Sequence, residues 1–171
     1  MRRIHIVTFG CQMNKLDSEC CAALLRAAGH ELAGSVDEAD TVLFQTCSVR
    51  NQAENRVLSA IGSLKPRKLR EKRFLIGVLG CMAQRRGGEL LREYPQIDLV
   101  CGTRAFHRLP ELIAQAETGQ VLATETEDGF DLPPELRQGG GLQAYVAVLR
   151  GCDNRCSYCV VPDARGREES I

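Results

Sequence analysis

The sequence predicts an α/β fold in which a parallel sheet of about four to five strands is flanked by helices. Short β-rich apolar runs recur along the chain, and a helical pattern follows each of them. Strands and helices in alternation form βαβ units, whose strands run parallel. The hydrophobic content of 44% is enough for a packed core, and 171 residues correspond to one domain and part of a second.

The first half of the chain contains two of these units. The first strand is predicted over residues 4–9 and its helix over about 16–28, where Gly29 is the expected stop. The second strand is predicted over 41–46. In the following helix Ser48 is the expected N-cap, and the apolar residues at helical spacing are Val49, Ala53, Val57, Ile61 and Leu64.

Two further units complete the predicted sheet. A strand over 74–79 precedes a helix over about 83–93, which Gly87 and Gly88 weaken. A strand over 97–100 leads to a helix near 106–117, closed by Gly119.

The chain changes character after residue 123. Residues 124–141 are rich in acidic residues, prolines and glycines, a composition typical of a linker. A fresh apolar strand is predicted over 144–149, and too few residues follow it to bury a core. We therefore expect a domain over 1–123, a linker over 124–143 and the incomplete start of a second domain over 144–171.

The charge balance excludes no class of partner, whereas the aromatic content and the lengths of the apolar runs argue against some functions. Lys plus Arg and Asp plus Glu tie at 22 each, so net charge favours no class of partner. Tryptophan is absent and aromatic residues make up 5%, which argues against a surface that stacks single-stranded nucleic acid. No apolar run approaches the ~20 residues of a membrane span, and the first is too short for a secretory signal. We expect a cytoplasmic protein with no membrane contact, whose cysteines stay reduced.

Three of the nine cysteines each follow a predicted strand directly: Cys11, Cys47 and Cys81. Because the carboxyl ends of parallel strands emerge at one edge of a sheet, we expect these thiols to lie side by side there. Such a set suits a cubane iron–sulfur cluster with one open iron, or a zinc site completed by another ligand. Polar residues around the thiols are candidate hydrogen-bond partners, namely Gln12, Asn14, Thr46 and Ser48.

The other cysteines of this region have simpler interpretations. Cys20 and Cys21 fall within a predicted helix and are expected to pack in the core. Cys101 ends a strand, and we interpret it as a strand-end thiol in preference to a fourth ligand.

A second set, Cys152, Cys156 and Cys159, lies in a compact loop after the last predicted strand. The Cys-x3-Cys-x2-Cys spacing can hold three irons of a [4Fe–4S] cluster and leave the fourth for S-adenosylmethionine. Tyr158 is a candidate contact for the adenine of that cofactor. The alternative is a zinc knuckle, which needs a fourth ligand from elsewhere.

Four stretches in this order resemble the radical-SAM methylthiotransferases. They are residues 8–14 with Asp17-Ser18-Glu19, residues 46–50 with Ala53-Glu54, residues 80–84, and residues 150–159 continuing into Val161-Pro162 and Arg165-Gly166. The resemblance covers the whole chain. One departure is Gln45, where the family usually has asparagine.

The resemblance implies a function for both cysteine sets. Cys11, Cys47 and Cys81 would hold an auxiliary [4Fe–4S] cluster associated with the inserted sulfur, and the second set would hold the radical-generating cluster that binds S-adenosylmethionine. The family adds a methylthio group to an unactivated C–H bond. The motifs are most similar to the enzymes that act on C2 of isopentenylated adenosine in tRNA. Other members modify threonylcarbamoyl-adenosine in tRNA, or an aspartate of a ribosomal protein.

The resemblance also implies what the chain lacks. Residues 144–171 would be the first strand and cluster loop of an incomplete radical-SAM barrel, so we expect an N-terminal fragment that is inactive alone. The expected partners are tRNA and an electron donor such as flavodoxin or ferredoxin, and the expected state is a monomer. A different class, a non-enzymatic zinc or redox module, stays open. For the basic run over 65–73, we favour a solvated helix end over a tRNA-phosphate contact.

Overall fold

The computed structural model describes residues 1–49, 51–124 and 145–170, and its main feature is one six-stranded parallel sheet. The strand order is β2-β1-β3-β4-β5-β6. The strands are β1 (Arg3–Thr8), β2 (Glu31–Leu32), β3 (Thr41–Thr46), β4 (Leu75–Gly80), β5 (Leu99–Cys101) and β6 (Val121–Ala123). The predicted α/β class is confirmed, and the two short edge strands β2 and β6 are additional to the four predicted in order.

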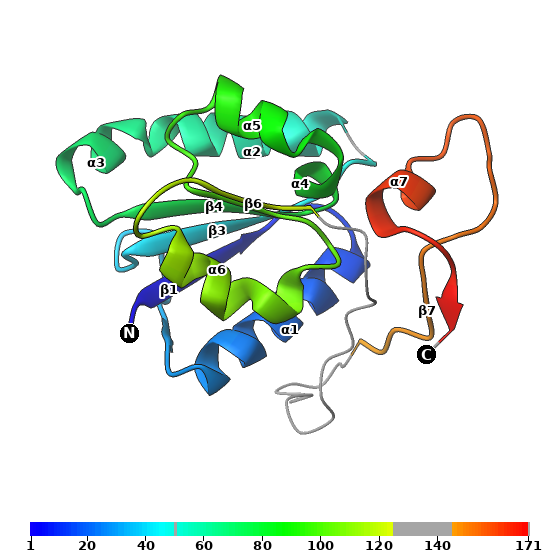
Figure 1. Cartoon of the computed structure of the whole chain (residues 1–171), viewed down its shortest axis with the longest axis horizontal. Helices are drawn as coiled ribbons and strands as arrows, with labels where there is room; N and C mark the ends of the chain where they lie inside the picture. Colours follow the sequence, from blue (N-terminus) through cyan, green and yellow to red (C-terminus); the bar gives the residue numbers. More distant parts are fainter. Residues whose placement is uncertain (50, 125–144, 171) are drawn as a thin grey trace.

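Helices cover both faces of the sheet (Figure 1). One face carries α1 (Gln12–Ala27), the short 3₁₀ helix η1 (Phe106–Arg108) and α6 (Leu109–Gln115). The other face carries α2 (Asn51–Ser63), α3 (Lys65–Arg70), α4 (Cys81–Arg86) and α5 (Gly88–Glu93). The helix predicted over 83–93 is thus two helices, and it breaks at Gly87, whose φ of 41° lies in the left-handed region.

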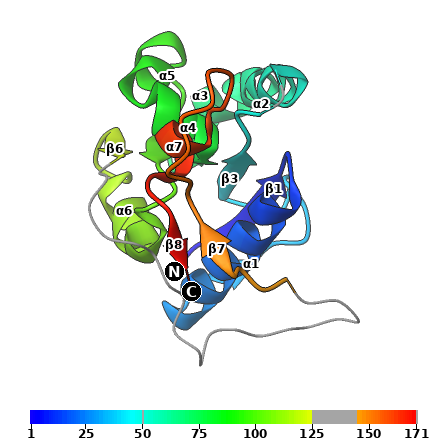
Figure 2. The same ribbon diagram turned by 90° about the vertical axis from the view of Figure 1, so that its right-hand side faces the viewer.

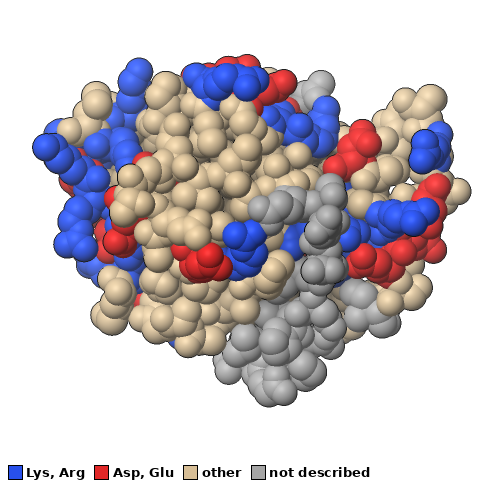
Figure 3. Space-filling view, viewed as in Figure 1, with Lys and Arg blue, Asp and Glu red and all other residues tan. Residues whose placement is uncertain are grey.

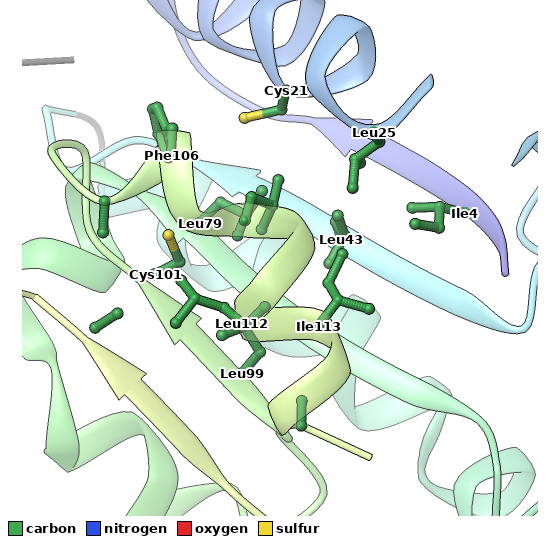
Figure 4. Close-up of a cluster of buried hydrophobic side chains, with 14 of the residues drawn as sticks. Ile4, Cys21, Leu25, Leu43, Leu79, Leu99, Cys101, Phe106, Leu112 and Ile113 are labelled. Carbon is green, nitrogen blue, oxygen red and sulfur yellow. The ribbon is translucent and has the colours of Figure 1, made fainter. Parts of the chain in front are cut away.

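The central strands are buried on both sides, which explains their continuous apolar sequences. Val42 and Phe44 of β3 pack under α2, whereas Leu43 between them packs under α1 and α6. Figure 4 shows the second of these cores, in which Cys21 of α1 and Cys101 of β5 lie among leucines and Phe106. The expected core packing of Cys20 and Cys21 is confirmed, and Cys101 packs there as well.

Two local expectations are wrong. Ser48 does not cap α2: the helix begins at Asn51, and the Ser48 hydroxyl is buried without a hydrogen-bond partner among the described residues. The strand predicted over 144–149 is reduced to β7 (Leu149–Arg150), which pairs antiparallel with β8 (Glu169–Ser170). A strand needs a partner for its backbone groups, and β8 offers two residues. The predicted linker lies outside the described residues except for Thr124.

The basic run forms α3 and the turn after it, at the end of the sheet where the strands begin (Figure 1). Lys and Arg side chains gather at this end of the molecule (Figure 3). Two of its cations have structural partners. Lys68 pairs with Asp98 at 2.7 Å, and Arg67 lies 4.2 Å from the centre of the Phe74 ring while it donates to the Val36 and Ala39 carbonyls. These contacts support a structural role for this part of the run, at the end opposite the cysteines.

None of the helices in the described ranges combines the length and the apolar character that a membrane span requires.

Gly80 and Gly29 provide a matched pair of stability tests. Both have positive φ, 91° and 83°, but a Cβ on Gly80 would lie 2.8 Å from the Thr46 carbonyl oxygen, whereas nothing lies within 4 Å of one on Gly29. We expect Gly29→Ala to cost about 1 kcal/mol of backbone strain and Gly80→Ala about 1–3 kcal/mol more from the close contact. Urea unfolding measures both, and equal losses would contradict the tight packing of β3 on β4.

The contact between Arg2 and Glu117 predicts a dependence of stability on acid. The hydrogen bond and charge of Arg2 lower the pKa of Glu117 from its ordinary value of 4.5, so the stabilisation is complete above that pH. It is lost as the pH falls through the lowered native pKa. Glu117→Gln should therefore flatten the decline of the urea midpoint below pH 4.5, relative to the unchanged chain. The same decline in both proteins would exclude this contribution.

Candidate functional site

The first three cysteines follow three neighbouring strands of the sheet. Thr8 of β1 pairs with Gln45 of β3, and Thr46 pairs with Gly80 of β4. Cys47 and Cys81 come directly after β3 and β4, and Cys11 comes three residues after Thr8, so one edge of the sheet carries all three residues. β2 pairs on one side of β1 and β3 on the other, so the order in which strands are added to the sheet reverses between β1 and β3. In open α/β sheets, ligands usually bind at the carboxyl edge beside such a reversal.

The three thiols differ in exposure. Cys11 is exposed and its Sγ lies 3.6 Å from the Asn14 Oδ1, whereas Cys47 and Cys81 are buried. The Cys47 Sγ accepts a hydrogen bond from the Val49 amide at 3.4 Å. Gly10 makes this arrangement possible: a Cβ there would overlap the Cys47 Cβ and lie 3.2 Å from its Sγ. The backbone before Cys11 therefore passes directly over Cys47.

The structure leaves ligation by these thiols as a prediction. No three Cys, His, Asp or Glu side chains within the described ranges are grouped closely enough to hold a metal ion. Cys47 and Cys81 are near enough to interact electrostatically. The edge thus gathers the three residues, while their ligation of a metal stays a prediction.

Arg165 is the residue of this edge that the sequence did not single out. It is the last residue of α7 (Val161–Arg165), which lies at the carboxyl ends of the strands (Figure 2). Its guanidinium lies 2.7 Å from the buried carboxylate of Asp17 and donates to the Asn14 Oδ1 at 3.1 Å. Arg165 and Asp17 belong to two of the stretches that resemble the methylthiotransferases, but nothing in the sequence pairs them with each other.

Charge and burial act against each other at this edge. Burial raises the pKa of the Cys81 thiol, and the charge and hydrogen bond of Arg165 oppose part of that rise. Burial alone lowers the pKa of Arg165, but Asp17 and Cys81 more than offset it, so the pKa lies above its ordinary value. Arg165 is therefore a permanent cation among groups that are anionic when ionised.

The predicted hydrogen-bonding residues have different surroundings. Asn14 is buried and donates to the Phe9 carbonyl at 2.7 Å, beside Cys11. Thr46 is also buried, but its hydroxyl donates to the Leu79 carbonyl at 2.6 Å and so joins β3 to β4. Ser48 has a buried hydroxyl without a partner in the described part of the chain, whereas Gln12 is exposed on the first turn of α1.

The second cysteine set lies in the loop between β7 and α7. Cys152 and Cys159 are half-buried and Cys156 is exposed. The loop is closed by a hydrogen bond from the Cys152 amide to the Gly166 carbonyl at 3.1 Å, and the Asn154 side-chain amide donates to the Cys152 Sγ at 3.5 Å. All three cysteines line an open hollow of about 900 Å³ together with arginines and acidic residues.

Tyr158 is 90% exposed and is not among the residues that line this hollow. Its predicted contact with adenine stays a prediction. In the core, burial, with smaller contributions from Cys101, Asp17 and Cys20, raises the pKa of Cys21 well above its ordinary value, so this thiol stays protonated.

Comparison with known proteins identifies relatives of the whole chain. A bacterial protein of Geobacter metallireducens named tRNA-2-methylthio-N(6)-dimethylallyladenosine synthase is 47% identical over 171 residues, which are 98% of this chain and 38% of that protein. Proteins of the same name from Porphyromonas gingivalis and Cereibacter sphaeroides are 43% and 44% identical over 99% of this chain. The chain spans 38% and 39% of their respective lengths.

A family description also matches the part of the chain that builds the sheet. The match is to "Uncharacterized protein family UPF0004" and extends over residues 3–102. It includes β1 to β5 and the three strand-end cysteines, and it covers more than half of the chain. The chain therefore belongs to the uncharacterized protein family UPF0004.

Proposed function

We propose that this chain is the N-terminal part of a methylthiotransferase that acts on C2 of isopentenylated adenosine in tRNA, with two [4Fe–4S] clusters and S-adenosylmethionine as cofactors. The observation that carries the proposal is the pair of cysteine sets, one at the carboxyl edge of the sheet and one in the loop after β7. The relatives' printed name, which specifies a tRNA dimethylallyladenosine product, supports the substrate.

The residues of the carboxyl edge fit an iron–sulfur cluster. Three thiols from adjacent strand ends match the ligand number of a cubane with one open iron. The buried hydroxyl of Ser48, next to Cys47, has no hydrogen-bond partner among residues 1–49, 51–124 and 145–170, and it can donate to a cluster or ligand sulfur. Gly10 keeps the space over Cys47 free of a side chain. We assign Cys11, Cys47 and Cys81 as the ligands.

The loop after β7 fits the second cluster and its cofactor. Cys152, Cys156 and Cys159 supply three ligands, and the hollow that they line is large enough for a small-molecule cofactor. Arg155 and Asp163 line the same hollow and offer both signs of charge, as the carboxylate and ammonium of a methionine group require. When bound, the cluster and S-adenosylmethionine would supply the one-electron chemistry that activates a C–H bond.

The remaining assignments belong to the whole protein. We propose tRNA and a small electron-transfer protein, such as a flavodoxin or ferredoxin, as its partners, and the cytoplasm as its location. The cysteines at the carboxyl edge and in the loop after β7 must stay reduced to bind clusters, and a reducing compartment keeps them so. We assign turnover to the whole protein and expect this chain alone to bind clusters without completing the reaction.

Cluster content tests the two ligand sets separately. After anaerobic reconstitution, Cys47→Ala and Cys156→Ala should each lose about half of the bound iron and sulfide, because each removes one ligand of one cluster. The double variant should lose nearly all. Iron and sulfide analysis with absorption spectra measures this, and Cys20→Ala, which changes a core thiol, should keep the full content. Unchanged iron in all variants would overturn the ligand assignment, and colourless protein with tightly bound zinc would replace the proposal with a zinc module.

The substrate is tested in the whole protein. Expressed in cells that lack their own tRNA methylthiotransferase, it should add the mass of a methylthio group to isopentenylated adenosine, and the Cys47→Ala and Cys156→Ala forms should not. Mass spectrometry of tRNA nucleosides and of ribosomal proteins provides the measurement. If threonylcarbamoyl-adenosine or a ribosomal aspartate carried the methylthio group instead, the proposed substrate would be wrong and that group would replace it.

A further inference from the structure

Arg165 joins two parts of the chain that are far apart in sequence. Its side chain leaves α7 and enters the carboxyl edge of the sheet, where only 11% of it is exposed. It ends against Asp17 and Asn14 of α1, at 2.7 Å and 3.1 Å, across 148 to 151 sequence positions. Asp17 is itself 2% exposed, so this is a buried ion pair.

The same guanidinium acts on Cys81 directly and is linked to Cys11 through Asn14. Helix α7 packs on α4, which begins at Cys81, so the positive charge of Arg165 acts on the Cys81 thiol. Asn14, which accepts from Arg165, also accepts from the Cys11 thiol through the same Oδ1 at 3.6 Å. One cation of the second cysteine segment is therefore part of the surroundings of the first cysteine set.

Other contacts fix the segment in the same place, and one of them, from Arg104 to the Arg165 main-chain carbonyl at 3.5 Å, reaches Arg165 without touching its guanidinium. The Thr103 hydroxyl donates to the Ala164 carbonyl at 2.8 Å, and Ala164 is buried. Arg104 pairs with Glu169 of β8 at 3.1 Å. Loss of Arg104 should therefore loosen this docking but leave the cation beside Cys81.

We propose that Arg165 is a positioning residue that docks the segment carrying Cys152, Cys156 and Cys159 on the carboxyl edge and compensates the negative charge of the sulfur ligands there. This inference rests on the proposed function, since it takes Cys11, Cys47 and Cys81 as ligands of one cluster. The inference adds Arg165, which lies outside that set of cysteines, to the surroundings of the cluster.

The charge at this edge explains why a buried arginine belongs there. Ligation deprotonates thiols, so three thiolates would join the buried Asp17 carboxylate in one place. A buried charge without a partner is strongly unfavourable, and Arg165 is the cation that faces both Asp17 and Cys81. Hydrogen bonds to cluster sulfurs and local charge also set the reduction potential of a cluster.

The reduction potential of the first cluster tests the inference directly. The measurement uses the chain with Cys152, Cys156 and Cys159 all changed to alanine, so that only the first cluster contributes to an EPR-monitored redox titration. Arg165→Met should shift the potential to a more negative value, because reduction adds negative charge that the guanidinium no longer stabilises. We expect at least a tenfold change in the ratio of oxidised to reduced cluster, about 59 mV for one electron. Arg165→Lys, which keeps the charge, should recover part of the shift.

Arg104→Met is the matched control, because it removes a docking arginine of the same interface. It should leave the potential of the first cluster unchanged. Hydrogen exchange of the Ala164 and Gly166 amides, measured on protein without clusters, reports docking alone. Both Arg165→Met and Arg104→Met should speed that exchange at least tenfold.

The outcomes separate this inference from the proposed function. A loaded cluster whose potential is the same in Arg165→Met overturns the inference and leaves the proposed function standing. Unchanged amide exchange in Arg165→Met also overturns it. If the unmodified chain takes up no iron, the proposed function fails and the assignment of charge compensation fails with it, while the exchange result still decides whether Arg165 docks the segment.

Discussion

The parallel register of β1, β3 and β4 is the constraint on which the rest of this molecule depends. It aligns three strand ends in adjacent positions, so that cysteines 34 and 36 residues apart share one edge. The register is fixed because the side chains of β3 and β4 alternate between two buried cores, and a slip by one residue would exchange the two faces. Core packing thus determines the position of the chemically active residues.

The carboxyl edge combines this fixed scaffold with a local charge problem. Asp17 is buried in α1, and the thiols beside it would become anionic on ligation. Arg165 supplies the compensating positive charge, and it comes from the segment that also carries the second cysteine set. Docking and charge compensation are therefore performed by one side chain, and the two cysteine sets are linked through it.

Local pattern predicted much of the fold and less of the site. The strand over 41–46 was predicted with its observed bounds, because an apolar β-branched run between turn signals is a strong pattern. The edge strands β2 and β6 have two and three residues, which are too few to show any periodicity. The prediction of a strand over 144–149 was wrong because pairing with β8, which no local pattern encodes, limits the strand to two residues. The cysteine edge follows from βαβ topology, whereas the Arg165–Asp17 pair is a long-range contact that only the folded chain reveals.

An anaerobic crystal structure with anomalous scattering at the iron edge tests the central claim most directly. The account predicts a compact iron peak bounded by the sulfurs of Cys11, Cys47 and Cys81, with the Arg165 guanidinium beside Cys81. Iron confined to the loop of Cys152, Cys156 and Cys159, with the strand-end thiols unligated, would contradict it.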